Sequence, residues 1–319
     1  MNISVIIPVF NGAATIEETI NSILNQTFKD IEIIIINDGS TDATLEIIEK
    51  ISDTRIKIFS YPNAGLSASR NRGISQAKGE YISFIDADDL WTPDKLESQW
   101  QALQENPQAA VAYSWTNYID ESSKFLKSGR RIKVNGDAFS KLLVTNFLEN
   151  GSNPLIRKTA LEKVGGFDES LSAAEDKDMW LRLAIYQEFI CVEEPQILYR
   201  TSTTSMSTNL KRQEAESLKV IERAFNYPKA EKLQHLKKQS LSHLYKYLTF
   251  KAIEAPPKQR QTLTAIYFWW NCIKNNPAML KNKNVMIIAV LKIFFPRLVQ
   301  KCRDVAVLRL HQRFGNTTN

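Results

Sequence analysis

The chain has 319 residues, of which 43% are hydrophobic and 24% charged, the composition of a soluble globular protein with one large domain or two ordinary ones. Its three cysteines, Cys191, Cys272 and Cys302, are odd in number and widely spaced. This argues against a disulfide framework or a cysteine-based metal site, and it favours a reducing compartment.

The net charge of +6 conceals an asymmetry along the chain. Residues 1–210 contain 20 Lys and Arg against 29 Asp and Glu, a balance of −9. Residues 211–319 contain 21 against 6, a balance of +15, so the two parts add up to the totals of 41 and 35. The asymmetry predicts an acidic domain over residues 1–210, followed by a basic region over residues 211–319 with a different role.

The first part alternates strands with helices. The N-terminal run MNISVIIPVF has no basic residue ahead of its apolar stretch, which indicates a first strand at 3–10 rather than a signal peptide. Further strands are expected at 31–37, 55–60 and 81–87, and helices at 14–26, 41–51, 66–77 and from Thr92-Pro93 to residue 103. Four consecutive isoleucines at 33–36 suit a parallel strand covered on both faces. The pattern predicts an α/β fold with a doubly wound, mostly parallel, Rossmann-like sheet.

Residues 105–210 give weaker signals. Expected elements are a strand at 109–115, a loop or hairpin at 124–133, a helix at 137–148, a strand at 154–158, a helix at 159–165 and short strands within 188–200. Between the last two lies the acidic and aromatic segment 173–184, and residues 201–208 form a polar loop.

From residue 211 onward the pattern predicts a basic α-helical region. Residues 229–253 form a long amphipathic candidate, and residues 284–299 are the most apolar run. Lys283, Lys292 and Arg297 leave at most eight uncharged residues together there. A membrane-spanning helix needs about 20, so none is predicted.

The basic region has three interpretations, namely a solvated helical face, a surface that docks on an anionic membrane, and a nucleic-acid binding surface. Docking is preferred, because Phe294, Phe295, Ile287, Ile288 and Leu291 could sit at the headgroup boundary while basic side chains meet acidic lipids. No helix-turn-helix, zinc or stacking motif supports nucleic acid. The expected location is cytoplasmic, peripheral on the inner face of the cytoplasmic membrane.

Polar residues gather where the first strands end. In doubly wound sheets ligands bind at the carboxyl ends of the strands, which places Pro8 to Phe10, Asn37-Asp38 and Asp86 to Asp89 along one edge. The stretch FIDADDLW (84–91) puts three carboxylates into four residues, and like charges this close repel one another. A divalent cation such as Mg²⁺ or Mn²⁺, which prefers oxygen ligands, would stabilise them. Taken alone, a solvated acidic turn explains the stretch as well.

Several stretches resemble the inverting family 2 nucleotide-sugar glycosyltransferases of the GT-A fold, over residues 3–205. They are SVIIPVFNG, SILNQTFKDIEIIIINDGSTDAT, NAGLSASRNRGI, AKGEYISFIDADDLWTPDKL, VGGFDES and AEDKDMWLRL, and they occur in family order. The resemblance implies a GT-A fold and a glycosyltransferase that uses Mn²⁺ or Mg²⁺. It also implies transfer from a nucleotide-sugar, typically a UDP-sugar, to a hydroxyl of a glycan or lipid-linked acceptor.

The resemblance also implies which residues bind the nucleotide. Pro8 and Phe10 match the position beside the base, where an aromatic surface favours stacking. Asp38 matches a carboxylate that accepts a hydrogen bond from the base. Arg70 matches a basic residue on the nucleotide side, with Arg72 as a less favoured substitute. Each residue also has a purely structural interpretation. Phe10 could be a core side chain, Asp38 an acid favoured at a helix N-terminus, and Arg70 a partner in a surface salt bridge.

The three aspartates of FIDADDLW divide between ribose and metal in the family. By resemblance Asp88 is the preferred metal ligand, Asp86 and Asp89 are further candidates, and Asp86 and Asp88 are also assigned to the nucleotide. The sequence leaves this division open. Trp91 is expected to pack beside the acidic turn.

Glu175 and Asp176 match the family's Glu-Asp motif, and Asp176 is the predicted catalytic base. Inverting transfer needs a group that deprotonates the acceptor hydroxyl as it attacks the anomeric carbon. Asp178 lies two residues further along the expected helix and therefore points elsewhere. Trp180 is predicted to support the site by packing, and Arg182 by a salt bridge in or beside it.

Two departures from the family pattern bear on substrate. Tyr199-Arg200 is followed by Thr201, where family members often have a histidine, so Arg200 alone remains a candidate to close over the diphosphate. The Gln-x-x-Arg-Trp motif of processive synthases is absent from the sequence, which predicts transfer of a single sugar. One alternative is a sugar nucleotidyltransferase, but such an enzyme has a glycine-rich phosphate loop after its first strand, and PVFNGAA is not such a loop. The other alternative is a non-catalytic scaffold that binds nucleotide-sugars.

Overall fold

The structure is a computed structural model that describes residues 2–202, 208–254, 261–281 and 286. Contacts divide the chain into two compact units, Met1–Gln234 and His235–Asn319. The division falls later than residue 210, because α8 (Leu210–Phe225) packs on α5 (Phe139–Val144) and α7 (Glu175–Tyr186) of the first unit. The domain extents 1–210 and 211–319 stay a prediction.

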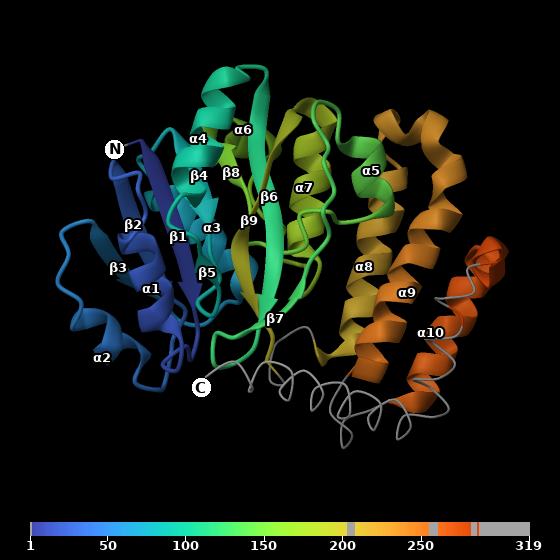
Figure 1. The fold of residues 1–319 in the computed structure, drawn as a ribbon, viewed down its shortest axis with the longest axis horizontal. Helices are drawn as coiled ribbons and strands as arrows, with labels where there is room; N and C mark the ends of the chain where they lie inside the picture. The colour runs from blue at the N-terminus through green and yellow to red at the C-terminus, as the bar shows by residue number, and fades with distance from the viewer. Residues whose placement is uncertain (1, 203–207, 255–260, 282–285, 287–319) are drawn as a thin grey trace, which may run out of the picture. The chain divides into compact units, whose positions relative to one another are not determined.

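The described strands of the first unit form one sheet in the order β3-β2-β1-β4-β8-β6-β9-β5, with β7 paired to β6 (Figure 1). Their bounds are β1 Ile3–Val9, β2 Ile31–Asn37, β3 Ile56–Ser60, β4 Tyr81–Phe84, β5 Leu90–Trp91, β6 Ala109–Ile119, β7 Phe125–Ser128, β8 Leu155–Arg157 and β9 Glu188–Arg200. Neighbours from β3 to β4 are parallel, as are β6 and β9, whereas β8 runs antiparallel to both β4 and β6. The predicted α/β class with a doubly wound, mostly parallel sheet is confirmed, and β8 joins its two parallel parts.

Helices cover both faces of this sheet. The remaining helices of the first unit are α1 Ile16–Leu24, α2 Thr44–Glu49, α3 Leu66–Gln76, α4 Lys95–Glu105 and α6 Lys158–Val164. Ile33 and Ile35 share a core with Ile20 of α1 and Leu96 of α4. The residues that alternate with these along β1 and β2 point to the opposite face of the sheet, which α3 covers. On that face Gly73 of α3 lies against Ile6 of β1. The isoleucines of β2 are all fully buried, as expected for a strand covered on both faces.

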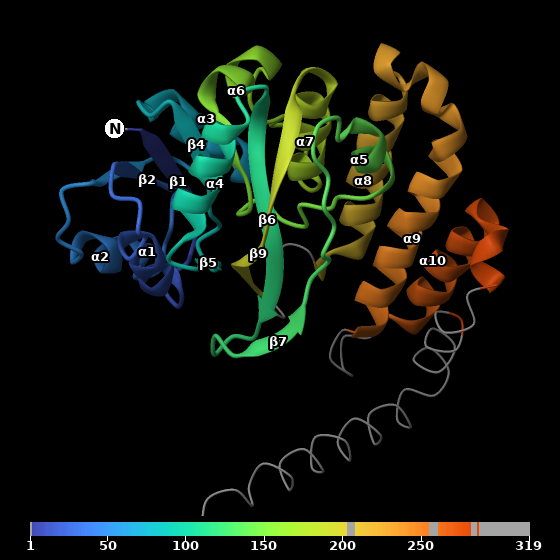
Figure 2. The same ribbon diagram turned by 45° about the horizontal axis from the view of Figure 1, so that its top comes forward.

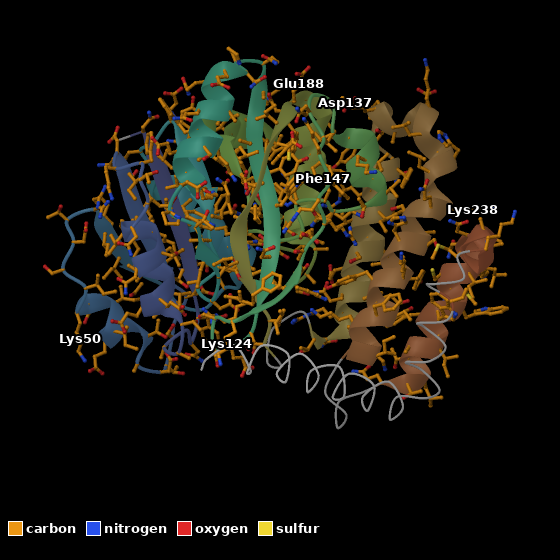
Figure 3. The ribbon with its side chains drawn as sticks, viewed as in Figure 1. Lys50, Lys124, Asp137, Phe147, Glu188 and Lys238 are labelled. Atoms are coloured by element: carbon orange, nitrogen blue, oxygen red, sulfur yellow. The ribbon has the colours of Figure 1, made fainter. Side chains whose placement is uncertain are left out.

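The second half of the sheet is more continuous than its sequence indicates. β6 runs on to Ile119, and β9 is one strand over residues 188–200 where short strands were expected. Of the stretch 124–133, expected to be a loop or hairpin, residues 125–128 form β7, which pairs with β6, and β7 lies at the lower edge of the sheet in both ribbon views (Figures 1 and 2). Phe147, labelled in Figure 3, follows α5 and packs on Tyr113 and Phe189 at ring-centroid distances of 5.0 and 6.5 Å. This contact holds the α5 segment against β6 and β9.

The second unit is helical in its described part. It begins within the 3₁₀ helix Pro228–Leu236 and contains α9 (Lys237–Glu254), α10 (Thr262–Asn275) and the 3₁₀ helix Pro277–Lys281. α9 and α10 pack through aromatic rings such as Tyr245 and Phe268, whose centroids lie 6.1 Å apart. No helix within the described ranges is long and apolar enough to cross a membrane. The apolar run 284–299 lies outside the described residues, apart from Met286, as do the five residues proposed to meet the headgroups.

The contact between α3 and β1 supplies a stability test. A Cβ added to Gly73 would come within 2.3 Å of Ile6 Cγ2, so Gly73→Ala overpacks the core, at a cost of about 1–3 kcal/mol. Better helix propensity offsets only about 0.5–1 kcal/mol of this. We expect a net loss of unfolding free energy in urea denaturation. Ser75→Ala, on the exposed side of the same helix, is the control, and equal stability of both variants would contradict the packing argument.

Candidate active site

The carboxyl ends of β1, β2 and β4 lie side by side. Val9 is in register with Asn37, and the N–H of Asp38 donates to the Val9 carbonyl at 2.8 Å. Ile6 pairs with Phe84, so the residues that follow Phe84 leave the sheet at the same edge. The strand-end residues expected from the sequence are therefore brought together. Phe10 is 53% exposed there and free to offer a ring face to a ligand.

Asp38 is buried and holds the loop that leads into α3. Its carboxylate accepts hydrogen bonds from the N–H groups of Ala64 and Gly65, at 3.0 and 2.8 Å, and from Arg72 Nη1 at 2.9 Å. The Arg72 guanidinium also lies over the Tyr61 ring, 4.6 Å from its centroid. Asp38 thus fixes the loop that precedes α3, and Arg72 holds the Asp38 carboxylate. Recognition of a base by Asp38 stays a prediction.

Asp89 is fully buried in the turn that follows β4. Its Oδ2 accepts from Ser152 Oγ at 2.5 Å, and its Oδ1 accepts from the N–H of Arg200 at 2.9 Å. Burial, together with the charges of Asp88 and Asp86, raises its pKa well above the ordinary value. Because both oxygens already bind the protein, Asp89 acts as an internal tie between the turn, β9 and the segment before β8.

Asp86 and Asp88 remain open toward solvent. The side chain of Asp86 is 26% exposed, and burial together with the charge of Asp86 raises the pKa of the half-buried Asp88 to about 6. A divalent cation stabilises carboxylates that lie this close together. Within the described residues no group of three or more His, Cys, Asp or Glu has a metal-site arrangement. Two carboxylates plus substrate oxygens are the usual set for Mg²⁺, so Asp86 and Asp88 fit a cation better than Asp89 does.

Arg70 connects the acidic turn to the N-terminus of α7. Its side chain is 1% exposed, and it donates from Nη2 to Asp86 Oδ1 at 2.7 Å and from Nη1 to Glu175 Oε1 at 2.8 Å. Burial by itself would lower the pKa of Arg70, but the charges of Asp86 and Glu175 raise it above the ordinary value. The guanidinium also lies 5.1 Å from the Phe167 ring centroid. A Cβ on Gly151 would come within 2.4 Å of Nη2, so only glycine leaves room for this arginine.

Asp176 lies in the first turn of α7, half-buried beside Glu175. Burial and the charge of Glu175 raise its pKa to about 6, against the opposing effects of the Lys177 N–H, Arg70 and Asn146. Asn146 Nδ2 donates to Asp176 Oδ2 at 3.0 Å and orients that carboxylate. A carboxylate with a pKa near 6 is ionised at neutral pH and is more basic than an ordinary aspartate, as a general base requires.

The other supporting candidates lie around this centre. Trp180 is fully buried and packs on Phe167, with ring centroids 6.3 Å apart. Arg182 donates to Asp178 at 2.8 Å and to the Val164 carbonyl at 2.8 Å, so it fastens α7 to α6 rather than facing the acidic turn. Asp178 also accepts from Arg223 of α8, at 3.0 Å.

Arg200, at the end of β9, supports the acidic turn from the far side. Its Nε donates to the Asp88 carbonyl at 2.7 Å, its Nη2 to Glu18 at 2.7 Å and its Nη1 to Ser123 Oγ at 2.9 Å. All three guanidinium nitrogens therefore bind acceptors of the protein. Trp91 is also internal, 3% exposed, with its Nε1 donating to the Ser152 carbonyl at 2.8 Å.

Sequence reasoning missed the polar segment before β8 and two neighbours of Asp176. Ser152 Oγ accepts from the N–H of Asp86 and donates to Asp89, so it fixes the turn. Asn146 orients Asp176, and burial lowers the pKa of Lys177 to about 8. The signal available was the run NGSN at 150–153, four small or polar residues that precede Pro154 and the strand β8; all four are buried.

Two solved glycosyltransferase structures share this fold. TarS 1–349 from S. aureus, in complex with UDP-GlcNAc, aligns with a TM-score of 0.59 and 18% identity over 88% of this chain and 92% of that one. The mannosyltransferase PcManGT from Pyrobaculum calidifontis, in complex with GDP-Man and Mn²⁺, gives 0.56 and 20% identity over 92% and 87%. The sheet and its acidic edge therefore belong to a GT-A fold.

Comparison of sequences defines the family. The family model described as "Glycosyltransferase like family 2" matches residues 4–252, so the chain belongs to that family, as its motifs indicated. Hyaluronan synthase from Pasteurella multocida is 28% identical over 312 residues, 95% of this chain and 30% of that protein. An "Uncharacterized glycosyltransferase" from Rickettsia typhi is 38% identical over 184 residues, 56% of this chain and 58% of that protein. The chain thus spans well under two thirds of the length of both relatives.

The two arginines of α3 give a matched pair of variants. Lysine cannot donate from two separate nitrogens, so Arg70→Lys should leave Asp86 or Glu175 without its partner. We expect a loss of about 1–3 kcal/mol in unfolding free energy and, through misplaced carboxylates, about 100-fold in sugar transfer. Arg72→Lys, at a side chain 26% exposed, is the control and should change both far less. Equal effects of the two substitutions would refute the bridging role of Arg70.

Proposed function

We propose that this chain is a metal-dependent inverting glycosyltransferase that moves a single sugar from a nucleotide-sugar, in the first instance a UDP-sugar, to a hydroxyl of a glycan or lipid-linked acceptor. The observation that supports this most is Arg70, which hydrogen bonds to both Asp86 and Glu175. Arg70 thereby links Asp86, an expected cation ligand, to Glu175, the neighbour of the expected base Asp176.

In the proposed reaction Asp176 takes the proton from the acceptor hydroxyl. The hydroxyl oxygen forms the new bond to the anomeric carbon while the bond from that carbon to the diphosphate oxygen breaks, with inversion. Asn146 and the N-terminus of α7 hold Asp176 in place and favour its charge. Asp86 and Asp88 would hold a divalent cation, which when bound stabilises the negative charge of the departing diphosphate.

The donor assignment has two supports. Phe10 offers an exposed ring at the edge where the loop shaped by Asp38 ends, which suits stacking on a base. The structural relatives were solved with UDP-GlcNAc and with GDP-Man and Mn²⁺, so both bind nucleotide-sugars. The relatives named hyaluronan synthase and chondroitin synthase favour a glycan acceptor.

We further propose that the enzyme works in the cytoplasm, at the inner face of the cytoplasmic membrane. The balance of +15 over residues 211–319 supports attraction to anionic lipids. Such a location would bring the site close to a lipid-linked acceptor.

Asp176→Asn tests the base. Because asparagine cannot accept the proton, transfer should fall by at least about 100-fold, while UDP binding measured by calorimetry should stay nearly unchanged. A variant that transferred sugar at the normal rate would exclude Asp176 as the base.

The pH profile tests the same residue. Asp176 must be ionised to act, so kcat/KM should rise with pH through an apparent pKa of about 6. Asn146→Ala removes a hydrogen bond that favours the charged form, so it should raise the pKa of Asp176 and move this limb to higher pH. A limb that did not move would show that another group controls the profile.

Donor and metal can be screened together, by release of UDP, GDP or dTDP with Mn²⁺, Mg²⁺ or a chelator. We expect the enzyme to release UDP and the chelator to abolish this release. In the Asp88→Asn variant, added Mn²⁺ should no longer increase the rate of UDP release. Asp89→Asn should instead lower the unfolding free energy, because one amide cannot accept both of its hydrogen bonds. Pyrophosphate release would favour the nucleotidyltransferase, and no turnover of any donor would favour the scaffold.

A further inference from the structure

Helix α10 is apolar on two opposite faces. One face is buried and consists of Ala265, Phe268, Trp269 and Cys272. The other carries Leu263, Ile266, Tyr267 and Trp270, which are 83%, 38%, 51% and 65% exposed. Both sets have the spacing i, i+3, i+4, i+7 of a continuous helical stripe. We call the second set the outer stripe.

The buried face already has its partner. Phe268 packs on Tyr245 of α9, and Ser242 Oγ of α9 donates to the Cys272 carbonyl at 3.0 Å. Of the outer stripe, Tyr267 also packs on Tyr245, with ring centroids 6.4 Å apart, so contact with α9 accounts for the buried face and for Tyr267. Leu263 and Trp270 are large apolar side chains that this contact does not use, and Leu280 of the following 3₁₀ helix adds a third at 52% exposed. Contiguous exposed apolar surface of this kind marks an interaction site.

The charge around the outer stripe indicates the partner. Residues 235–319 contain 15 Lys and Arg against 2 Asp and Glu, a balance of +13. Lys274 and Lys281 follow the stripe in the sequence and are exposed, and residues 262–281 contain no acidic residue. Two copies of so basic a unit repel each other, whereas an anionic surface attracts it. An apolar stripe that carries tryptophan and is bordered by lysines is the composition of a helix lying in a membrane interface.

We propose that the outer stripe of α10 inserts into the headgroup boundary of an anionic lipid bilayer, with Lys274 and Lys281 contacting the lipid phosphates. This moves the membrane contact from the run 284–299, where the sequence indicated it, to α10. The inference rests on the membrane partner of the proposed function and makes it specific to one helix face. Vesicle binding is measured without donor or acceptor, so its failure and a failure of sugar transfer can be told apart.

The test uses the full chain and vesicles of phosphatidylcholine with or without phosphatidylglycerol. Trp270 is the most exposed of the six tryptophans, since Trp91, Trp180 and Trp269 are buried and the other two are half-buried. Its emission should therefore shift to shorter wavelength when vesicles with phosphatidylglycerol are added. Trp270→Leu should abolish this shift while the protein still co-sediments with the vesicles.

Charge placed on the stripe should prevent insertion. We expect Leu263→Glu with Trp270→Glu to weaken co-sedimentation with phosphatidylglycerol vesicles by at least about tenfold. Lys274→Gln with Lys281→Gln should weaken it less and should reduce its salt dependence. Tyr186→Glu, at a side chain 60% exposed in the first unit, is the matched control and should bind like the parent chain. Unchanged thermal unfolding of each variant shows that the fold is kept.

Three results would overturn the proposal. The first is a double glutamate variant that binds anionic vesicles as well as the parent chain. The second is a parent chain that binds no vesicles. The third is a parent chain that is dimeric by light scattering and becomes monomeric in the double glutamate variant, which would assign the stripe to a second copy of the chain.

Discussion

The buried guanidinium of Arg70 is the interaction on which the rest of the site depends. Removing such a cation from water costs several kcal/mol unless its charge and its N–H groups are satisfied. Here Asp86 and Glu175 balance its charge and accept hydrogen bonds from Nη2 and Nη1, whereas Nε is buried without a hydrogen-bond partner, and Gly151 leaves the space that the side chain occupies. Because Arg70 lies on α3, Asp86 after β4 and Glu175 on α7, this one side chain fixes three elements relative to one another. Asp176 follows Glu175 in the first turn of α7, so this arrangement also determines the position of Asp176.

The crowded carboxylates of FIDADDLW are divided by burial. Asp89 is enclosed and hydrogen bonded by Ser152 and the Arg200 backbone, and it holds the turn together. Asp86 and Asp88 are partly exposed, and burial together with the charge of Asp86 raises the pKa of Asp88 to about 6. The same residue type thus does structural work in one position and leaves a charge for a ligand in the other two. The difference arises from the protein surrounding each residue.

The strands and helices of the first half could be predicted from the sequence because their hydrophobic patterns are strong. The continuous isoleucines of β2 predicted a doubly covered parallel strand, and the residues that follow β1, β2 and β4 were expected at one edge, where they lie. The second half was harder. β9 is a single long strand although Pro195 interrupts its pattern, and β8 has only three residues. Both are stabilised by neighbours distant in sequence, which local periodicity cannot reveal.

By itself the sequence determined the fold class, the family and the residue types of the site, because hydrophobic period and motif order are properties of the chain. Tertiary structure decided which of those residues meet. It placed Arg70 rather than Arg72 between the carboxylates of Asp86 and Glu175, and it buried Asp89. It also directed the Arg200 guanidinium to acceptors of the protein and brought Asn146 and Ser152 into the site. It also left Leu263, Ile266 and Trp270 of α10 exposed. Each of these depends on burial and on partners far apart in the chain, and neither quantity is local.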